Sequence, residues 1–207
     1  MVEEKESTQD SSERGDTTAE LVETREEEIV EAVFDGERAY VEPENADRIS
    51  QQGIYGQQLD NGQLELVPVE ILHLLERKRI EVRDRTGRTL SSADIVNALL
   101  PQHPDLWTQY LVFRDLRSRG YAVRQGFGGG LGFRVYARGD RPGEATANQL
   151  VYVLRDGEPI SLHDLDMVTQ TAAAARKRLV FALVDQNGEV NYYKVAQVTL
   201  ENKAGET

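Results

Sequence analysis

Arginine is the residue type with the most evident chemistry in this sequence, because it outnumbers lysine nineteen to five and gathers in two runs. One run has six basic residues between positions 77 and 88, and the other has four arginines between positions 114 and 124. Clustered guanidinium groups bind the phosphates of nucleic acids. Alternatively, these side chains face solvent or pair with nearby acids, as exposed mixed-charge faces commonly do. The acids within reach are Glu76, Glu81, Asp84 and Asp115.

Other kinds of site are restricted by composition. There is no cysteine, which excludes disulfides and thiolate metal sites. The histidines, His73, His103 and His163, lie too far apart for metal-ligand spacing, so we expect no metal and no cofactor. The glycine-rich segment 126–132 lacks the Gly-Lys-Ser/Thr of a phosphate-binding loop and does not lead into a helix. We interpret it as a turn.

The net charge of −12 over 207 residues is unevenly distributed. Residues 1–28 hold eleven acidic and three basic residues and no aromatic residue. Such a segment cannot bury enough apolar surface to offset its ordering entropy, so we predict a disordered acidic tail. No apolar run approaches the roughly 20 residues of a membrane helix, and no signal peptide is present. We therefore expect an intracellular, cytoplasmic protein of prokaryotic type, with no membrane partner.

Residues 29–104 have the pattern of a small α+β unit. Ile29–Tyr40 alternates weakly around Asp35-Gly36, which favours a hairpin, and residues 48–67 repeat that pattern. Pro68 suits the first turn of a helix, and the residues that follow it have helical apolar spacing. Ser91 and Asp94 predict another helix start, with Pro101 and Pro104 beyond its end.

Residues 105–200 predict an α/β domain with a central mixed sheet, followed by a short tail at 201–207. A helix should span Leu111 to Leu116 and end at Gly120. Ser161 and Asp164 resemble a capping box, from which we expect a helix reaching Arg178. The strands expected are 133–136, 149–154, 179–185 and 189–195, the last two forming a hairpin.

Three segments of this second unit carry a resemblance to a known family. They read Tyr110-Leu-Val-Phe-Arg-Asp-Leu-Arg-Ser-Arg-Gly-Tyr121, Gly132-Phe-Arg-Val-Tyr-Ala-Arg-Gly139 and Arg176-Lys-Arg-Leu-Val-Phe-Ala-Leu-Val-Asp185. With the N-terminal unit, they resemble the archaeal tRNA-splicing (tRNA-intron) endonuclease family over about residues 30–200. The resemblance implies metal-free cleavage of pre-tRNA at bulge-helix-bulge sites, which leaves a 2′,3′-cyclic phosphate and a 5′-OH.

The family's catalytic trio is incomplete in this sequence. The resemblance implies a Tyr that deprotonates the ribose 2′-OH and a Lys that neutralises the phosphorane, and these positions are Tyr136 and Lys177. The His that protonates the leaving 5′-oxygen is replaced by Thr146. The Arg that clasps a bulged base in the family is replaced by Gln170. Alternatively, Tyr136 is a core aromatic residue and Lys177 a solvated helix-end lysine.

The resemblance also implies contacts with RNA and with other chains. RNA contacts are expected at Arg134, Arg138 and Arg176. Subunit contacts are expected at the acidic turn and at the last strand, with the interface residues Asp185, Glu189, Tyr192 and Val195. These contacts would form a heterotetramer with a catalytic subunit, or a homodimer.

Three functions remain open from the sequence. The leading hypothesis is a structural, non-catalytic subunit of a tRNA-splicing endonuclease, because Thr146 and Gln170 replace functional residues. The second is an active endonuclease with a rearranged acid. The third is an RNA-binding or assembly module unrelated to splicing, which would bind unrelated structured RNA strongly and without preference for bulges.

Overall fold

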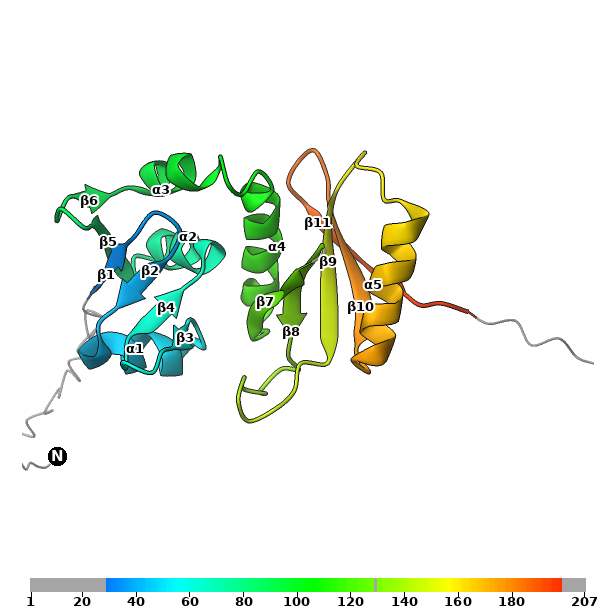
Figure 1. Cartoon of the computed structure of the whole chain (residues 1–207), viewed down its shortest axis with the longest axis horizontal. Coiled ribbons are helices and arrows are strands. Elements are labelled where there is room, and N and C mark those ends of the chain that lie inside the picture. Colours follow the sequence, from blue (N-terminus) through cyan, green and yellow to red (C-terminus); the bar gives the residue numbers. More distant parts are fainter. Residues whose placement is uncertain (1–28, 129, 199–207) are drawn as a thin grey trace, which may run out of the picture.

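The computed structural model describes residues 29–128 and 130–198, which form two β-sheets accompanied by helices (Figure 1). The acidic segment 1–28 and the tail 201–207 lie outside the described residues. Within the two described ranges, no helix is long and apolar enough to cross a membrane.

The first sheet has six strands in the order β3-β4-β2-β1-β5-β6. They are β1 (Val30–Phe34), β2 (Ala39–Val41), β3 (Gln57–Gln58), β4 (Leu64–Leu66), β5 (Ile80–Asp84) and β6 (Thr89–Leu90). Strand β5 is parallel to β1, and the other pairs are antiparallel. The helices of this part are α1 (Pro43–Gly53), α2 (Pro68–Glu76) and α3 (Ser92–Leu99). This arrangement is the α+β unit predicted from the sequence.

The sequence prediction was wrong for residues 48–53, which belong to a helix. We expected the hairpin pattern to resume at residue 48, whereas α1 occupies this segment and only β3 and β4 follow as a hairpin. Pro43 at the first helical position fits the helix because its φ is already helical. The helix buries Ala46 and Ile49, which lie three residues apart on one face. Two apolar residues are a weak periodic signal, and packing onto the sheet completes the helix.

The second sheet has five strands in the order β11-β10-β9-β8-β7. They are β7 (Val123–Gly128), β8 (Leu131–Val135), β9 (Gln149–Arg155), β10 (Arg178–Val184) and β11 (Val190–Val195). Only the β9–β10 pair is parallel, so the sheet is mixed, as predicted. Helix α4 (Leu106–Ser118) lies on one face and α5 (Leu162–Ala174) on the other (Figure 1). Successive residues of β10 alternate between these faces, since Leu179 packs under α5 and Ala182 toward α4.

The two sheets share one hydrophobic core, in which α2 of the first part packs against α4 of the second. His73 of α2 lies inside this core, with its ring 5.9 Å from that of Tyr55 and 5.6 Å from that of Phe113. Its side chain is buried, and its Nδ1 has no hydrogen-bond partner. Burial, reinforced by the charge of Arg117, lowers the pKa of His73 from 6.5 to about 4.

We expect this histidine to make the fold sensitive to acid. Between pH 6.5 and 4 the unfolded chain binds a proton at His73 that the folded chain does not, so stability falls as the pH is lowered. The full loss is about 3 kcal/mol in the free energy of unfolding. Urea unfolding at a series of pH values should show this loss in the wild type, and His73→Leu should remove it. Parallel stability curves for the two proteins would contradict the assignment.

Candidate functional site

Three chain segments meet at one end of the second sheet and bring two of the predicted site residues together. Tyr136 directly follows β8, Ala147 precedes β9, and Lys177 precedes β10. The Lys177 Nζ donates a hydrogen bond of 2.5 Å to the Ala147 carbonyl oxygen. Tyr136 packs against the same Ala147 in a small buried cluster. Tyr136 and Lys177 therefore both contact the residue that follows Thr146.

The position of Lys177 is set by the way α5 ends. We expected this helix to reach Arg178, but it ends at Ala174. Arg176 takes the left-handed conformation (φ 53°), its N–H bonds the Ala173 carbonyl, and the Lys177 N–H bonds the Ala172 carbonyl. This pair of bonds is a Schellman motif, which terminates a helix and is usually built on glycine. The motif turns Lys177 away from the helix and toward the β8–β9 connection.

We expect Arg176→Gly to stabilise the fold, because glycine adopts a positive φ without the crowding of a Cβ atom. The free energy of unfolding should rise by about 0.5–1 kcal/mol. Arg176→Ala is the matched control, since it removes the guanidinium but keeps the Cβ, and it should leave stability unchanged. Urea unfolding measures both variants. Equal stability of the two variants would show that the positive φ carries no strain.

Tyr136 lies in a packed environment rather than in open solvent. Its side chain is 6% exposed and packs with Ala122 and Ala147. Ile54, the residue after α1, packs against the same cluster. Ile54 has a φ of 57°, a rare conformation for a β-branched residue. No sequence signal predicts this contact, because it joins residues from distant parts of the chain.

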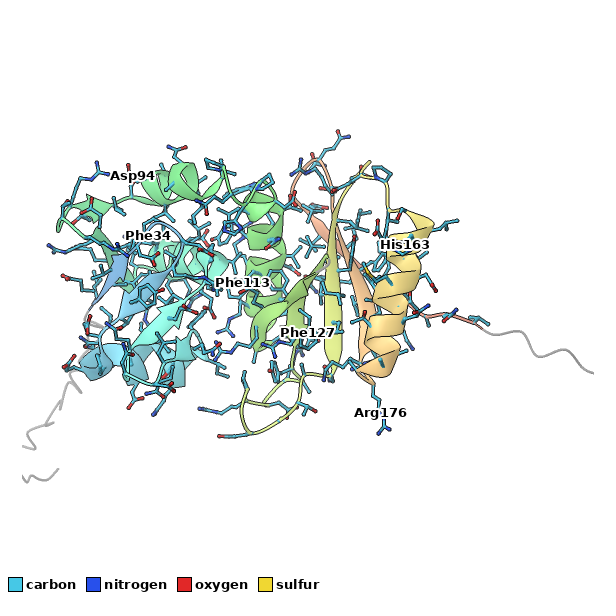
Figure 2. The ribbon with its side chains drawn as sticks, in the orientation of Figure 1. Phe34, Asp94, Phe113, Phe127, His163 and Arg176 are labelled. Atoms are coloured by element: carbon cyan, nitrogen blue, oxygen red, sulfur yellow. The ribbon has the colours of Figure 1, made fainter. Side chains whose placement is uncertain are left out.

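No histidine lies near this end of the second sheet in the described part of the chain. Thr146 is exposed there. His163 and Arg176 lie at opposite ends of α5 (Figure 2), a helix of 13 residues and therefore about 20 Å long. His73 is enclosed in the shared core, and His103 lies in the α3–α4 connection. Within the described residues, none of the three histidines therefore lies beside Tyr136 and Lys177.

The three arginines expected to contact RNA lie on the segments around this site, and none forms an ion pair within the described residues. Arg134 stacks over the exposed ring of Phe127 at 5.2 Å and donates to the Gln125 carbonyl. Arg138 lies over the ring of Tyr121 at 5.1 Å, and Arg176 is exposed. These contacts are all within the chain, so RNA binding by the three arginines stays a prediction.

Gln170, which the resemblance led us to expect at the position of a base-clasping arginine, is occupied within its own helix. Its Nε2 donates to the Asp166 carboxylate at 2.6 Å, one turn away. This position therefore presents no cation to a ligand.

Five arginines of the two basic runs pair with acids within the described residues, as one of the two interpretations predicted. The bridges, from 2.6 to 3.5 Å, are Arg83–Glu81, Arg88–Asp84, Arg114–Glu76 and Arg119–Asp115. Arg124 pairs with the buried Glu70 at 3.3 Å. These arginines are therefore engaged within the chain.

The expected interface residues belong to the β10–β11 hairpin. The Asp185 carboxylate accepts hydrogen bonds from the N–H groups of Asn187 and Glu189, which shapes the turn. The Tyr192 hydroxyl donates to Asp115 at 2.7 Å. Val195 packs under α5, and Glu189 is exposed. Strand β11 is the edge of its sheet, so a backbone edge remains open to another chain.

Comparison with known proteins identifies the family. The tRNA-splicing endonuclease of Pyrococcus furiosus is 37% identical over 170 residues, which cover 81% of this chain and 95% of that protein. The chain belongs to the tRNA-splicing endonuclease family. The family model of the tRNA intron endonuclease N-terminal domain matches residues 30–96 of this chain. The family model of the catalytic C-terminal domain matches residues 106–192. We propose a domain boundary near residue 105, between the two matches.

Other relatives of this endonuclease-family chain differ in length. The tRNA-splicing endonuclease of Thermococcus kodakarensis is 36% identical over 163 residues, covering 79% of this chain and 95% of that protein. That of Methanococcoides burtonii is 33% identical over 170 residues, covering 82% of this chain. The chain spans about half the length of the Methanococcoides burtonii protein, since the match covers 47% of it.

Proposed function

We propose that this chain is a subunit of an endonuclease that removes introns from pre-tRNA at bulge-helix-bulge sites, and that it supports a catalytic partner chain. One observation carries the proposal. Tyr136 and Lys177 meet at Ala147, while the neighbouring family position holds the exposed Thr146. The fold around the site is thus retained although its proton donor is absent.

The chemistry of the site explains why the missing residue matters. A tyrosine at position 136 supplies a base for the ribose 2′-OH, and the Lys177 ammonium stabilises the charge of the phosphorane. Without an acid, the 5′-oxygen leaves as an alkoxide, because a threonine hydroxyl does not give up its proton near neutral pH. Loss of a general acid lowers the rate by about 10²–10⁴-fold.

A second candidate function is an active endonuclease with a rearranged acid. The contact of both Tyr136 and Lys177 with Ala147 favours it, because two members of the trio remain together. In that case the chain alone cleaves pre-tRNA, and Tyr136→Phe or Lys177→Ala abolishes the cleavage.

Cleavage of a bulge-helix-bulge pre-tRNA by the purified full-length chain tests the proposal. We expect only residual cleavage by the chain alone, about 10²–10⁴-fold slower than cleavage by the mixture. Efficient cuts that leave 2′,3′-cyclic phosphate should appear when a second endonuclease-family chain from the same cell is added. The Lys177→Ala variant of this chain should support that activity as well as the wild type. Efficient specific cleavage by the chain alone, lost on Lys177→Ala, would establish the second candidate instead.

The partner contacts in this proposal involve the β10–β11 hairpin. The open edge of β11 and the exposed Glu189 are available to a neighbouring chain. Asp185 acts within its own turn, so its effect on assembly would come through the shape of that turn. Glu189→Lys should weaken assembly, as measured by light scattering of the mixed chains.

A further inference from the structure

A pocket of about 360 Å³ is lined by residues at the C-terminal end of α4 and by residues of the second sheet. Its wall is formed by Leu116 of α4 and by Arg119 and Tyr121, which follow this helix. Its floor comes from four adjacent strands, with the residues Val135, Gln149, Arg178, Val180, Tyr192 and Lys194. We name it the α4 pocket.

The strand register explains why these floor residues share one face. Gln149 of β9 lies opposite Val135 of β8 and opposite Arg178 of β10. Val180, two residues further along β10, lies opposite Lys194 of β11. Residues in register, and residues two apart on a strand, point to the same side of a sheet. The register therefore places Arg178 and Lys194 on one surface.

These two cations have no acidic partner in the described ranges 29–128 and 130–198. Arg178 and Lys194 are both exposed, and within those ranges their side chains form no ion pair or hydrogen bond. The third cation of the pocket, Arg119, is held by Asp115 at 2.7 Å. Two neighbouring positive charges repel each other, and an anion bound between them relieves that repulsion. Phosphate oxygens suit such a site, because guanidinium and ammonium groups donate strong charge-assisted hydrogen bonds to them.

The rest of the pocket suits a flat apolar group beside the anion. Leu116, Val135 and Val180 supply aliphatic surface. Tyr121 and Tyr192 add aromatic surface, each with a guanidinium group over its ring, Arg138 at 5.1 Å and Arg119 at 5.6 Å. Bases of single-stranded nucleic acids bind aromatic side chains of this kind by stacking. The volume lies within the range of about 300–1,000 Å³ usual for small-ligand sites.

From this geometry we infer that the α4 pocket receives one nucleotide of RNA, with its phosphate between Arg178 and Lys194 and its base against the tyrosine rings. We take the ligand to be RNA on the basis of the proposed function. The pocket adjoins the candidate site, since Arg178 follows Lys177 and Val135 precedes Tyr136. A nucleotide there is a neighbour of the one at the candidate site, so the pocket would anchor the strand beside the cut.

Adenosine 5′-monophosphate is the first probe of the pocket. Titration into the methyl-labelled full-length chain should produce saturable NMR shifts of the Leu116, Val135 and Val180 methyl groups. Adenosine, which lacks the phosphate, should bind at least about tenfold more weakly. Absence of shifts at these methyl groups would overturn the proposal. Equal affinities for adenosine and adenosine 5′-monophosphate would overturn it as well.

Charge-removal variants test the two cations. The double variant Arg178→Gln/Lys194→Gln should weaken binding of adenosine 5′-monophosphate at least about tenfold, because both phosphate contacts are lost. Both positions are exposed, so the fold should be retained. Arg85→Gln is the matched control, since Arg85 is an exposed arginine in the first sheet's β5–β6 turn. Unchanged binding by the double variant would remove the proposal.

A short single-stranded RNA distinguishes an RNA strand from a free mononucleotide. It should shift the same methyl groups and compete with adenosine 5′-monophosphate. Binding of the mononucleotide without binding of the oligonucleotide would make the pocket a mononucleotide site and overturn the RNA assignment. Failure of this proposal and failure of the proposed function can be told apart. If the assembled chains cleave pre-tRNA while the pocket binds no nucleotide, only the pocket proposal fails. If the pocket binds nucleotide while the assembled chains do not cleave pre-tRNA, only the proposed function fails.

Discussion

Replacing Thr146 by histidine is expected to raise cleavage of a bulge-helix-bulge pre-tRNA by the purified chain about 10²–10⁴-fold. The imidazole would supply the proton that the leaving 5′-oxygen requires, beside Tyr136 and Lys177. Thr146 is exposed, so the larger side chain can be accommodated without repacking the core. Single-turnover cleavage of labelled pre-tRNA measures the gain.

The pH dependence of that gain identifies the group responsible. An exposed histidine has a pKa of about 6.5 and acts as an acid only when protonated. The ratio of the Thr146→His rate to the wild-type rate should therefore fall as the pH rises above that value. Thr146→Gln is the matched control, because it adds a polar side chain without an acid, and it should give no gain.

Two further variants test whether the histidine acts with the retained residues. Adding Tyr136→Phe or Lys177→Ala to Thr146→His should remove most of the gain, because the three groups act on one reaction. A gain that survives both additions would mean that the histidine acts elsewhere. Equal rates for Thr146→His and Thr146→Gln would show that residue 146 does not occupy the acid position.

The largest loss of stability is expected from Glu70→Ala, at about 3–5 kcal/mol in the free energy of unfolding. Glu70 is 2% exposed, and its carboxylate accepts the N–H groups of Gly56 and Val67 at 3.0 and 3.1 Å. It also pairs with Arg124 of β7, which belongs to the second sheet. Alanine would leave three donors without a partner, one of them charged. Urea unfolding measures the loss.

A double-mutant cycle separates the ion pair from the backbone contacts. Arg124→Met should cost less than Glu70→Ala, because the carboxylate keeps both amide donors. The double variant should be more stable than the sum of the single losses predicts, by about 1.5–3 kcal/mol. Exact additivity would mean that Glu70 and Arg124 do not interact, and a small effect of Glu70→Ala would mean that water replaces the carboxylate.

Secondary structure was predictable where its signals were local. The helix starts at Ser91 and Ser161 were confirmed because each serine Oγ accepts the N–H group three residues later, a bond between near neighbours. The end of α5 was not predictable, because Arg176 adopts a backbone conformation that favours glycine. Helix α1 was missed because much of its stability comes from packing against the sheet.

For the candidate site, the sequence indicated which residues to consider but not how they pack together. The resemblance pointed to Tyr136 and Lys177, and the structure brings both to Ala147, although their catalytic roles stay predictions. The packing of Ile54 against this cluster was not predictable, because it depends on how the two sheets meet. The same holds for the α4 pocket, whose cations Arg178 and Lys194 become neighbours only through the register of β10 and β11.

The register of β10 also restricts how this chain can vary in length during evolution. Lys177 bonds the Ala147 carbonyl, while the next residue, Arg178, lines the α4 pocket. Because side chains alternate along a strand, a length change between α5 and β10 that shifts the register of β10 by one residue would exchange the sides reached by the two cations. The link from Ala175 to Lys177 is also fixed by the Schellman bonds. Length changes should therefore be absent from this link in functional relatives and tolerated in the β8–β9 loop.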